Sequence, residues 1–174
     1  ELQYNVSAMR LKVLEELQIQ AGYSMELATS GAKEAFDVFH RERCSVELYP
    51  DVLETVSTLK ENFVLGALTN GNADIFLTEA GSYFDFAFRA EEVGATKPSP
   101  ALFEAAKNFA GVDYDEIVHV GDDPIGDIKG AKFTGVRAIW INRSSLPWQG
   151  EVPPDNEIKS LTELPKVLSC MNGS

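Results

Sequence analysis

The sequence predicts an α/β protein with a largely parallel sheet, preceded by a helical unit. From Tyr49 onward, short apolar runs alternate with segments whose apolar residues recur at helical spacing. The connections between these segments are short, which favours right-handed crossovers and therefore parallel strands. Before Tyr49, two helical patterns follow each other with no strand between them.

The helical unit accounts for the first part of the chain. One helix is expected from Met9 to Ala21, where Gly22 stands at a position typical of a helix stop, and a second from about Ala28 to Arg43. Their apolar stripes are interpreted as packing surface. We assign residues 1–48 to this unit and residues 49–174 to the α/β core.

The core is expected to start with a helix opened by Pro50 and the buried strand Phe63–Leu68. Further elements are then expected in order: a helix over Ala73–Ala80, a strand at Phe86–Phe88, a helix begun by Ser99 and Pro100, a strand from Ile117, a helix to about Thr134, a strand over Val136–Ile141, a loop over Pro147–Pro154 and a short helix near Leu161–Leu168.

Charge and composition exclude several classes of function. The net charge of −12 makes the surface repel phosphate backbones, so nucleic-acid binding is not expected. No apolar run approaches the roughly 18 residues of a spanning helix and no leader is recognisable, so we expect no membrane partner and a cytoplasmic location. Cys44 and Cys170 lack metal-ligand spacing. Nothing in the residues specifies an oligomeric state.

Three carboxylates follow the strand that begins at Ile117. Gly121 ends the apolar run, and Asp122, Asp123 and Asp127 come next. Open α/β sheets bind ligands at the carboxyl ends of their strands, and carboxylates this close repel one another unless a cation offsets them. Hard oxygen ligands suit Mg²⁺, so one interpretation is a magnesium site. The other is a solvated acidic turn in which an aspartate caps a helix.

Thr69, Asn70 and Gly71 form a polar turn after the strand Phe63–Leu68. Asn-Gly is a strong hairpin signal, but the residues that follow have a helical period rather than an alternating one. A turn from strand to helix directs its hydroxyl, amide and N–H groups toward a helix N-terminus, which is an arrangement that binds phosphate. On these residues alone, both interpretations stand.

Lys97 lies in a loop, where Pro98 disfavours an α conformation and keeps it extended. Most such lysines are solvated surface charges. This one falls between the polar turn and the acidic cluster in a protein rich in acids, so it is a candidate to neutralise both an anion and the carboxylates around a metal.

This order of residues resembles the haloacid dehalogenase-like hydrolase superfamily over nearly the whole chain. Leu68-Thr69-Asn70-Gly71 is similar to its second motif, Lys97-Pro98 to its third, and Gly121-Asp122-Asp123-Pro124-Ile125-Gly126-Asp127 with Gly130-Ala131 to its fourth. Most members are Mg²⁺-dependent phosphatases. The likeness is greatest to small-metabolite phosphatases with a helical cap, including those acting on flavin mononucleotide or riboflavin-pathway phosphates. It implies a Rossmannoid parallel sheet with helices on both faces, and a cap formed in part by residues 1–48.

The resemblance also implies a role for each matched residue. Thr69 and Lys97 would be catalytic and, with Asn70 and Gly71, would bind the phosphoryl group of a small phosphorylated metabolite. Asp122 would hold Mg²⁺. Asp127 is assigned to the metal site with Asp122, and there Asp127, with Asp123 as a weaker candidate, would act through water or by positioning Lys97. Phosphoryl transfer asks for this kind of positioning and for cations near developing negative charge.

The first motif of the family, an Asp-x-Asp at the end of the first strand, has no counterpart here. The acids before Thr69 fall on predicted helices, as do Glu15 and Asp37, or at a helix start, as does Asp51. In the family, that strand is the middle of the sheet. We therefore expect a core without its first, central strand. The longer parent protein is expected to be a phosphatase that forms an aspartyl-phosphate. These 174 residues alone are expected to show no turnover.

Three alternatives were weighed against a phosphatase. A phosphate-accepting receiver domain has its acids before the Thr and Lys, whereas Thr69 and Lys97 precede Asp122 here. A non-catalytic binding module would keep the fold without the chemistry. Dehalogenases of the superfamily need no metal and have small polar residues in the fourth motif. Four further side chains could contact a substrate, but exposed surface is the favoured interpretation for each: His40, Arg41, Arg43 and Trp148.

Overall fold

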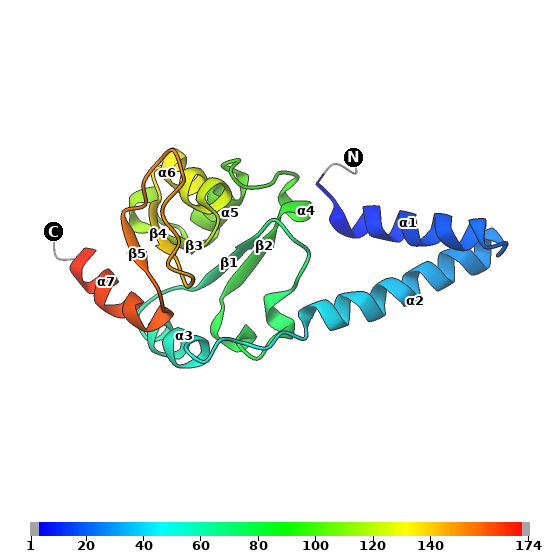
Figure 1. Ribbon diagram of the computed structural model, residues 1–174, viewed down its shortest axis with the longest axis horizontal. Coiled ribbons are helices and arrows are strands. Elements are labelled where there is room, and N and C mark those ends of the chain that lie inside the picture. Colours follow the sequence, from blue (N-terminus) through cyan, green and yellow to red (C-terminus); the bar gives the residue numbers. More distant parts are fainter. Residues whose placement is uncertain (1–3, 172–174) are drawn as a thin grey trace.

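The computed structural model describes residues 4–171 and shows a helical arm that projects from an α/β core (Figure 1). The arm is a hairpin of α1 (Val6–Gln20) and α2 (Met25–Cys44), and each helix starts three residues before its predicted start. Asn5 and Ser24 explain these starts, because their side chains accept hydrogen bonds from backbone N–H groups of the first turns. Residues 1–3 and 172–174, the outer ends of the two proposed domains, lie outside the described residues.

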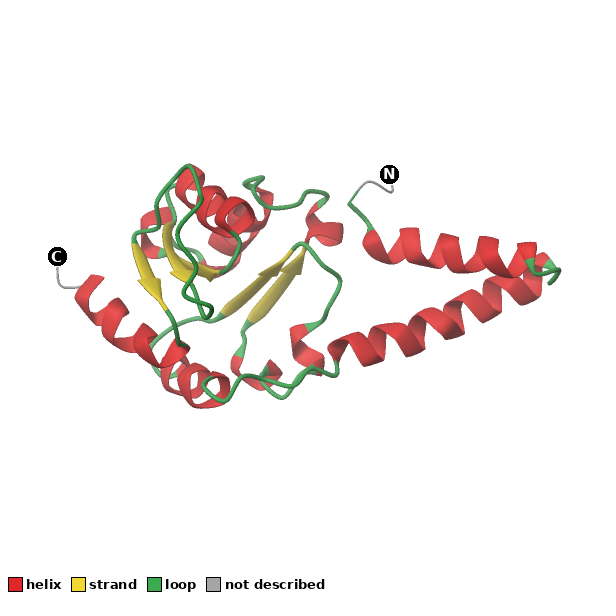
Figure 2. Ribbon diagram, viewed as in Figure 1, coloured by secondary structure: helices red, strands yellow, loops and turns green. Residues whose placement is uncertain are grey.

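The strands of residues 4–171 form two separate parallel sheets (Figure 2). In the first, β1 (Gly66–Thr69) pairs with β2 (Phe86–Arg89). In the second, the order is β3 (Val118–Gly121), β4 (Arg137–Ile141) and β5 (Asn156–Ile158). The predicted α/β class with parallel strands is confirmed.

Helices cover both faces of the second sheet, as predicted. These helices are α3 (Val52–Lys60), α5 (Ala101–Ala110), α6 (Gly130–Thr134) and α7 (Leu164–Met171), whereas the short α4 (Ala90–Val93) contacts β2 of the first sheet. Strand β4 alternates between two apolar clusters, as a strand buried on both faces must. Ala138 and Trp140 pack with Phe103 of α5, whereas Ile139 packs with Leu164 of α7.

The segment after β1 differs from the prediction, because Ala73–Ala80 does not form an α-helix. Two 3-10 turns take its place, at Ile75–Leu77 and Gly81–Tyr83. Local hydrogen bonds of polar side chains compete with the helix: Asp74 accepts from the N–H of Phe76. Thr78 is extended and ends the first turn, and its hydroxyl donates to the carbonyl of Ile75.

Two strands also differ from the prediction, one in where it begins and one in being present at all. β1 begins at Gly66 rather than Phe63, and the side chain of Val64 is 60% exposed instead of buried. β5 was not predicted, because only Ile158 of its three residues is buried and it presents no apolar run.

No helix within residues 4–171 has both the length and the apolar character that crossing a bilayer requires.

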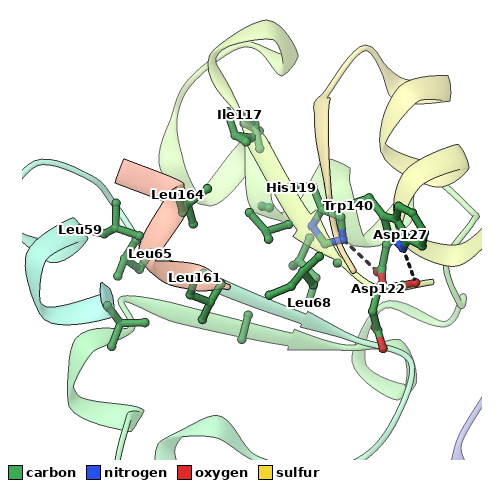
Figure 3. A pocket seen from close by; sticks show the side chains of 18 of the residues that line it. Leu59, Leu65, Leu68, Ile117, His119, Asp122, Asp127, Trp140, Leu161 and Leu164 are labelled. Carbon is green, nitrogen blue, oxygen red and sulfur yellow. Dashed lines mark hydrogen bonds and ion pairs between the residues drawn. The ribbon is translucent and has the colours of Figure 1, made fainter. Parts of the chain in front are cut away.

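A cavity of about 1160 Å³ lies between the two sheets, and β1 and β3, which both line it, do not pair with each other. Figure 3 shows its two ends. Leucines such as Leu59, Leu65 and Leu164 line one end, and His119, Asp122 and Asp127 line the other. The strands therefore stand apart where we expected the sheet to lack its central strand.

Candidate functional site

Three segments distant in the chain meet at the carboxyl ends of β1 and β3. Lys97 joins them, because its ammonium donates to the carbonyl of Leu68 at 2.7 Å and to Oδ1 of Asp127 at 2.6 Å. Leu68 belongs to β1, and Asp127 lies in the π-helical turn Pro124–Lys129 that follows β3. Turns of this kind recur at functional sites. The predicted grouping of Lys97 with both strand ends is thus present in the structure.

Asn70 fixes the loop that carries Lys97. Its amide donates to the carbonyl of Lys97 at 3.0 Å, and the N–H of Lys97 donates back to the amide oxygen at 2.7 Å. These bonds use the Asn70 amide to hold the lysine loop, so its backbone N–H is the group better placed for a substrate.

Thr69 and Gly71 form the surface of the polar turn, and we call residues Thr69–Gly71 the phosphate turn. The N–H of Gly71 donates to Oγ1 of Thr69 at 3.0 Å, so the hydroxyl hydrogen of Thr69 is available to another acceptor. No α-helix follows this turn, which corrects the expected helix N-terminus. The donors here are therefore a hydroxyl and backbone N–H groups, without the dipole of a following helix.

Asp127 is the most constrained acid of the site, with a side chain 9% exposed. Its Oδ1 accepts from Lys97 and lies 3.0 Å from Nε2 of His119, and its Oδ2 accepts from the N–H of Asp123 at 3.1 Å. Gly121 leaves the room for this carboxyl group, because a Cβ there would lie 2.3 Å from its carbon.

The pKa of Asp127 is held well below its ordinary value. Burial opposes ionisation, but the hydrogen bond from His119 and the charge and hydrogen bond of Lys97 outweigh that cost. Asp127 is therefore an anion whose oxygens are engaged by protein donors. This arrangement favours a positioning role over direct metal ligation.

Sequence reasoning did not identify His119. It lies in β3 with its imidazole edge-on to the ring of Phe103, at a centroid distance of 5.1 Å, and its side chain is 12% exposed. The available signal was a single polar residue between Val118 and Val120 in an apolar strand. Such a residue needs a buried partner, and here the partner is Asp127.

Asp122 and Asp123 are both exposed but play different parts. Asp123 accepts from the N–H of Ile125 at 2.9 Å and so caps the following turn, which was the alternative interpretation for this cluster. The side chain of Asp122 forms no hydrogen bond within residues 4–171, while Nε1 of Trp140 donates to its backbone carbonyl at 3.0 Å. Asp122 is thus a fixed residue with an uncommitted carboxylate.

The donor chemistry suits Mg²⁺ in part. Within residues 4–171, no three His, Cys, Asp or Glu side chains gather in a way that could hold a metal. Magnesium does not need such a cage, since it is commonly held by one or two carboxylates together with water and substrate phosphate. Asp122, an exposed hard-oxygen donor, fits that pattern as a single ligand.

Trp148 and His40 are less exposed than we expected. Trp148 is half-buried and packs against Trp140 at a centroid distance of 4.8 Å, so it belongs to the packing around β4. His40 is half-buried, with Nε2 2.8 Å from the carbonyl of Asn72. Arg41 and Arg43 are exposed, as expected.

Comparisons with known proteins agree with this geometry. A family model described as haloacid dehalogenase-like hydrolase matches residues 7–135. The chain is 32% identical over 172 residues to the 5-amino-6-(5-phospho-D-ribitylamino)uracil phosphatase YigB of Escherichia coli, covering 97% of this chain and 72% of that protein. It is 35% identical over 161 residues to a phosphoserine phosphatase of Thermus thermophilus, covering 89% of this chain and 63% of that one.

A solved structure gives the same result for the fold. A 2-haloacid dehalogenase from Pseudomonas syringae is similar with a TM-score of 0.94 at 42% identity, over 97% of this chain and 74% of that one. The range matched by the family model contains Thr69, Lys97 and Asp122. The chain therefore belongs to the haloacid dehalogenase-like hydrolase family, whose members are enzymes of the hydrolase class.

Proposed function

We propose that this chain supplies the phosphate-binding and Mg²⁺-binding part of a phosphatase for a small phosphorylated metabolite. The observation that carries the proposal is the position of Lys97, whose ammonium contacts the end of β1 and the acidic turn after β3 at once. The names of the relatives YigB and phosphoserine phosphatase support a phosphate ester as the substrate class.

Each residue then has a distinct part in the reaction. The hydroxyl of Thr69 and the N–H of Asn70 donate to phosphoryl oxygens, while Lys97, held by Asp127 at 2.6 Å, places a positive charge beside them. Asp122 would hold Mg²⁺, which when bound supplies further positive charge to the phosphoryl group. Asp127 orients Lys97 and does not itself touch the substrate.

The nucleophile is proposed to come from a strand outside these 174 residues. The cavity between β1 and β3 has apolar walls that suit a strand, and its polar end lies at the acids and Lys97. The relatives are also longer than the matched region. An aspartate at the end of such a strand would attack phosphorus and break the P–O ester bond, which releases the substrate's alcohol and leaves an aspartyl-phosphate. Water would then hydrolyse this intermediate to inorganic phosphate and the free carboxylate.

A dehalogenase is the second candidate, because the similar Pseudomonas syringae structure is described as one. Its reaction would displace a halide from carbon and would have no need of a metal-holding acid. The uncommitted carboxylate of Asp122, an exposed hard-oxygen donor of the kind that Mg²⁺ prefers, favours phosphate chemistry over that alternative.

Phosphate and halide release separate these functions. We expect the natural protein, with any residues that precede Glu1, to release phosphate from p-nitrophenyl phosphate or from a panel of phosphorylated metabolites when Mg²⁺ is present. Lys97→Met should lower this rate at least a hundredfold, since the main charge facing the phosphoryl group is lost. The 174 residues alone should release none.

Three results would contradict these statements. Halide release from 2-chloropropionate without phosphate release would favour the dehalogenase. Phosphate release that is indifferent to Mg²⁺ would remove the metal from the proposal. Mg²⁺-dependent turnover by the 174 residues alone would show that no outside nucleophile is needed.

A further inference from the structure

The last turn of α2 is anchored beside the phosphate turn. His40 lies 2.8 Å, through Nε2, from the carbonyl of Asn72, and the N–H of Asp74 donates to Sγ of Cys44 at 3.3 Å. Cys44 is only 2% exposed and Asn72 is fully buried, so these contacts are internal and well defined. The loop that leaves the phosphate turn thus holds the end of α2 in place.

Asn72 also receives the first helix of the arm. Nη1 of Arg10 donates to its side-chain oxygen at 3.1 Å, and its amide donates to the hydroxyl of Ser7 at 3.2 Å. Both helices of the arm therefore meet the core at the residue that directly follows the phosphate turn.

This anchoring places the guanidinium of Arg43 over Gly71. A Cβ added at Gly71 would lie 3.1 Å from Nη2 of Arg43 and 3.4 Å from Oγ1 of Thr69. The guanidinium of Arg43 and the hydroxyl of Thr69 therefore flank the same small space beside Gly71. From the sequence alone, exposed surface was the favoured interpretation of Arg43 and a substrate contact was the alternative.

The charge of Arg43 is not used within residues 4–171. Its side chain forms no ion pair there, although the whole chain has 27 acidic residues against 15 basic ones. By contrast, Arg143 is paired with Asp51, and Arg89 with Glu92. A guanidinium left without an acid, beside a hydroxyl whose hydrogen is free to donate, is arranged to receive an anion.

We propose that Arg43 binds the substrate's phosphoryl group from the helical arm, together with Thr69 on the core. This inference rests on the proposed function, because it assigns a further contact to the same phosphate. The planar fork of a guanidinium matches two oxygens of a phosphoryl group, which an ammonium cannot do. Bound phosphate would then bridge α2 and β1, so that the arm takes part in binding.

Binding of inorganic phosphate to the 174-residue chain, in the presence of Mg²⁺, tests this contact without turnover. Isothermal titration would compare Arg43→Gln, Arg43→Lys, Thr69→Val and a control, Arg41→Gln. The control removes the same charge from an exposed residue of α2, and residues two apart do not share a helix face.

We expect Arg43→Gln to weaken phosphate binding about tenfold, the order lost with a charge-assisted hydrogen bond, and Arg43→Lys to recover part of the loss. Arg41→Gln should change the affinity less than about twofold, because salt screens a charge that does not touch the ligand. The melting temperatures of all three arginine variants should match the wild type, which separates binding from a structural effect.

The outcomes distinguish the inference from the function on which it rests. If Thr69→Val weakens binding and Arg43→Gln behaves like Arg41→Gln, the inference on Arg43 is wrong and the phosphate turn stands. If Arg43→Gln weakens binding but Thr69→Val does not, the anion lies elsewhere and both fail. Both also fail if the wild-type chain binds no phosphate.

Discussion

A few side chains hold the site residues in position, and Asp127 makes the most contacts among them. Lys97 and His119 both point to its Oδ1, and the turn after β3 closes onto its Oδ2. Lys97 is itself only 8% exposed in its side chain, so its charge depends on a buried partner. Loss of that partner would leave a buried ammonium uncompensated, which costs more than the pair contributes.

Asp127→Asn should therefore lower the free energy of unfolding by about 3 kcal/mol, as breaking a buried pair does. Asp123→Asn is the matched control, because Asp123 is exposed and asparagine caps a turn as well as aspartate does. It should cost less than about 0.5 kcal/mol. Urea unfolding of the two variants measures both values. Equal losses would mean that Lys97 does not rely on Asp127.

At the residue scale, the sequence predicted the groups that lie at strand ends. Thr69, Lys97 and Asp122 could be found because each has a distinct neighbour pattern and their order in the chain is informative. His119 could not, because a polar residue inside a strand shows no partner until the fold brings Asp127 to it. Arg43 was named only as the weaker candidate for a substrate contact, because the sequence does not show that the anchoring of α2 brings this arginine to the phosphate turn.

The carboxylate of Asp51, which lies away from the site, joins several elements of the core by hydrogen bonds. Asp51 stands at the start of α3, and its carboxylate accepts from both Nη atoms of Arg143 at 2.9 and 3.0 Å. It also accepts from the hydroxyl of Ser160 and the N–H of Leu161. One aspartate thus joins α3 to the loop after β4 and to the turn that leads into α7.

These donors lower the pKa of Asp51, with the hydrogen bond from Arg143 as the largest cause and burial opposing it. Because the folded pKa lies below the unfolded value of about 3.9, the unfolded chain binds the proton more readily. The stabilisation is therefore present above about pH 4 and is lost as the pH falls through the folded pKa.

Asp51→Asn should lower the free energy of unfolding at pH 7 by about 1 to 3 kcal/mol, the range for hydrogen bonds to a charged group. It should also reduce the loss of stability on acidification below about pH 4. Asp115→Asn, at an exposed aspartate, is the control and should leave both unchanged. Denaturation at a series of pH values measures this, and an unchanged acid profile in Asp51→Asn would show that another group controls it.

Elements with a strong period were predicted well, and those shaped by tertiary contacts were not. The helices of the arm and α5 follow from their spacing, with ends shifted by a few residues. Ala73–Ala80 failed because Asp74 and Thr78 bond to the local backbone. β5 forms because it pairs with β4, and no residue pattern in Asn156–Ile158 predicts that pairing.

The whole molecule is divided by the cavity between β1 and β3. Apolar strand residues that the sequence predicts to be buried are only half-buried there, as at Leu68 and Val120. Two unpaired strand edges that face one space form a template for a further strand. A gap in the sheet was expected because these residues lack the Asp-x-Asp motif that ends the family's first, central strand. The cavity lies between β1 and β3, where that strand would be, and apolar residues line much of it.

At this scale the central claim is that three distant segments serve one phosphoryl group. Titration of the ¹⁵N-labelled 174-residue chain with inorganic phosphate at constant Mg²⁺ tests it most directly. The account predicts that amide signals of Thr69–Gly71, Lys97 and Asp122 shift together along one curve with one Kd. Shifts confined to a single segment, or separate curves for the phosphate turn and Asp122, would contradict it.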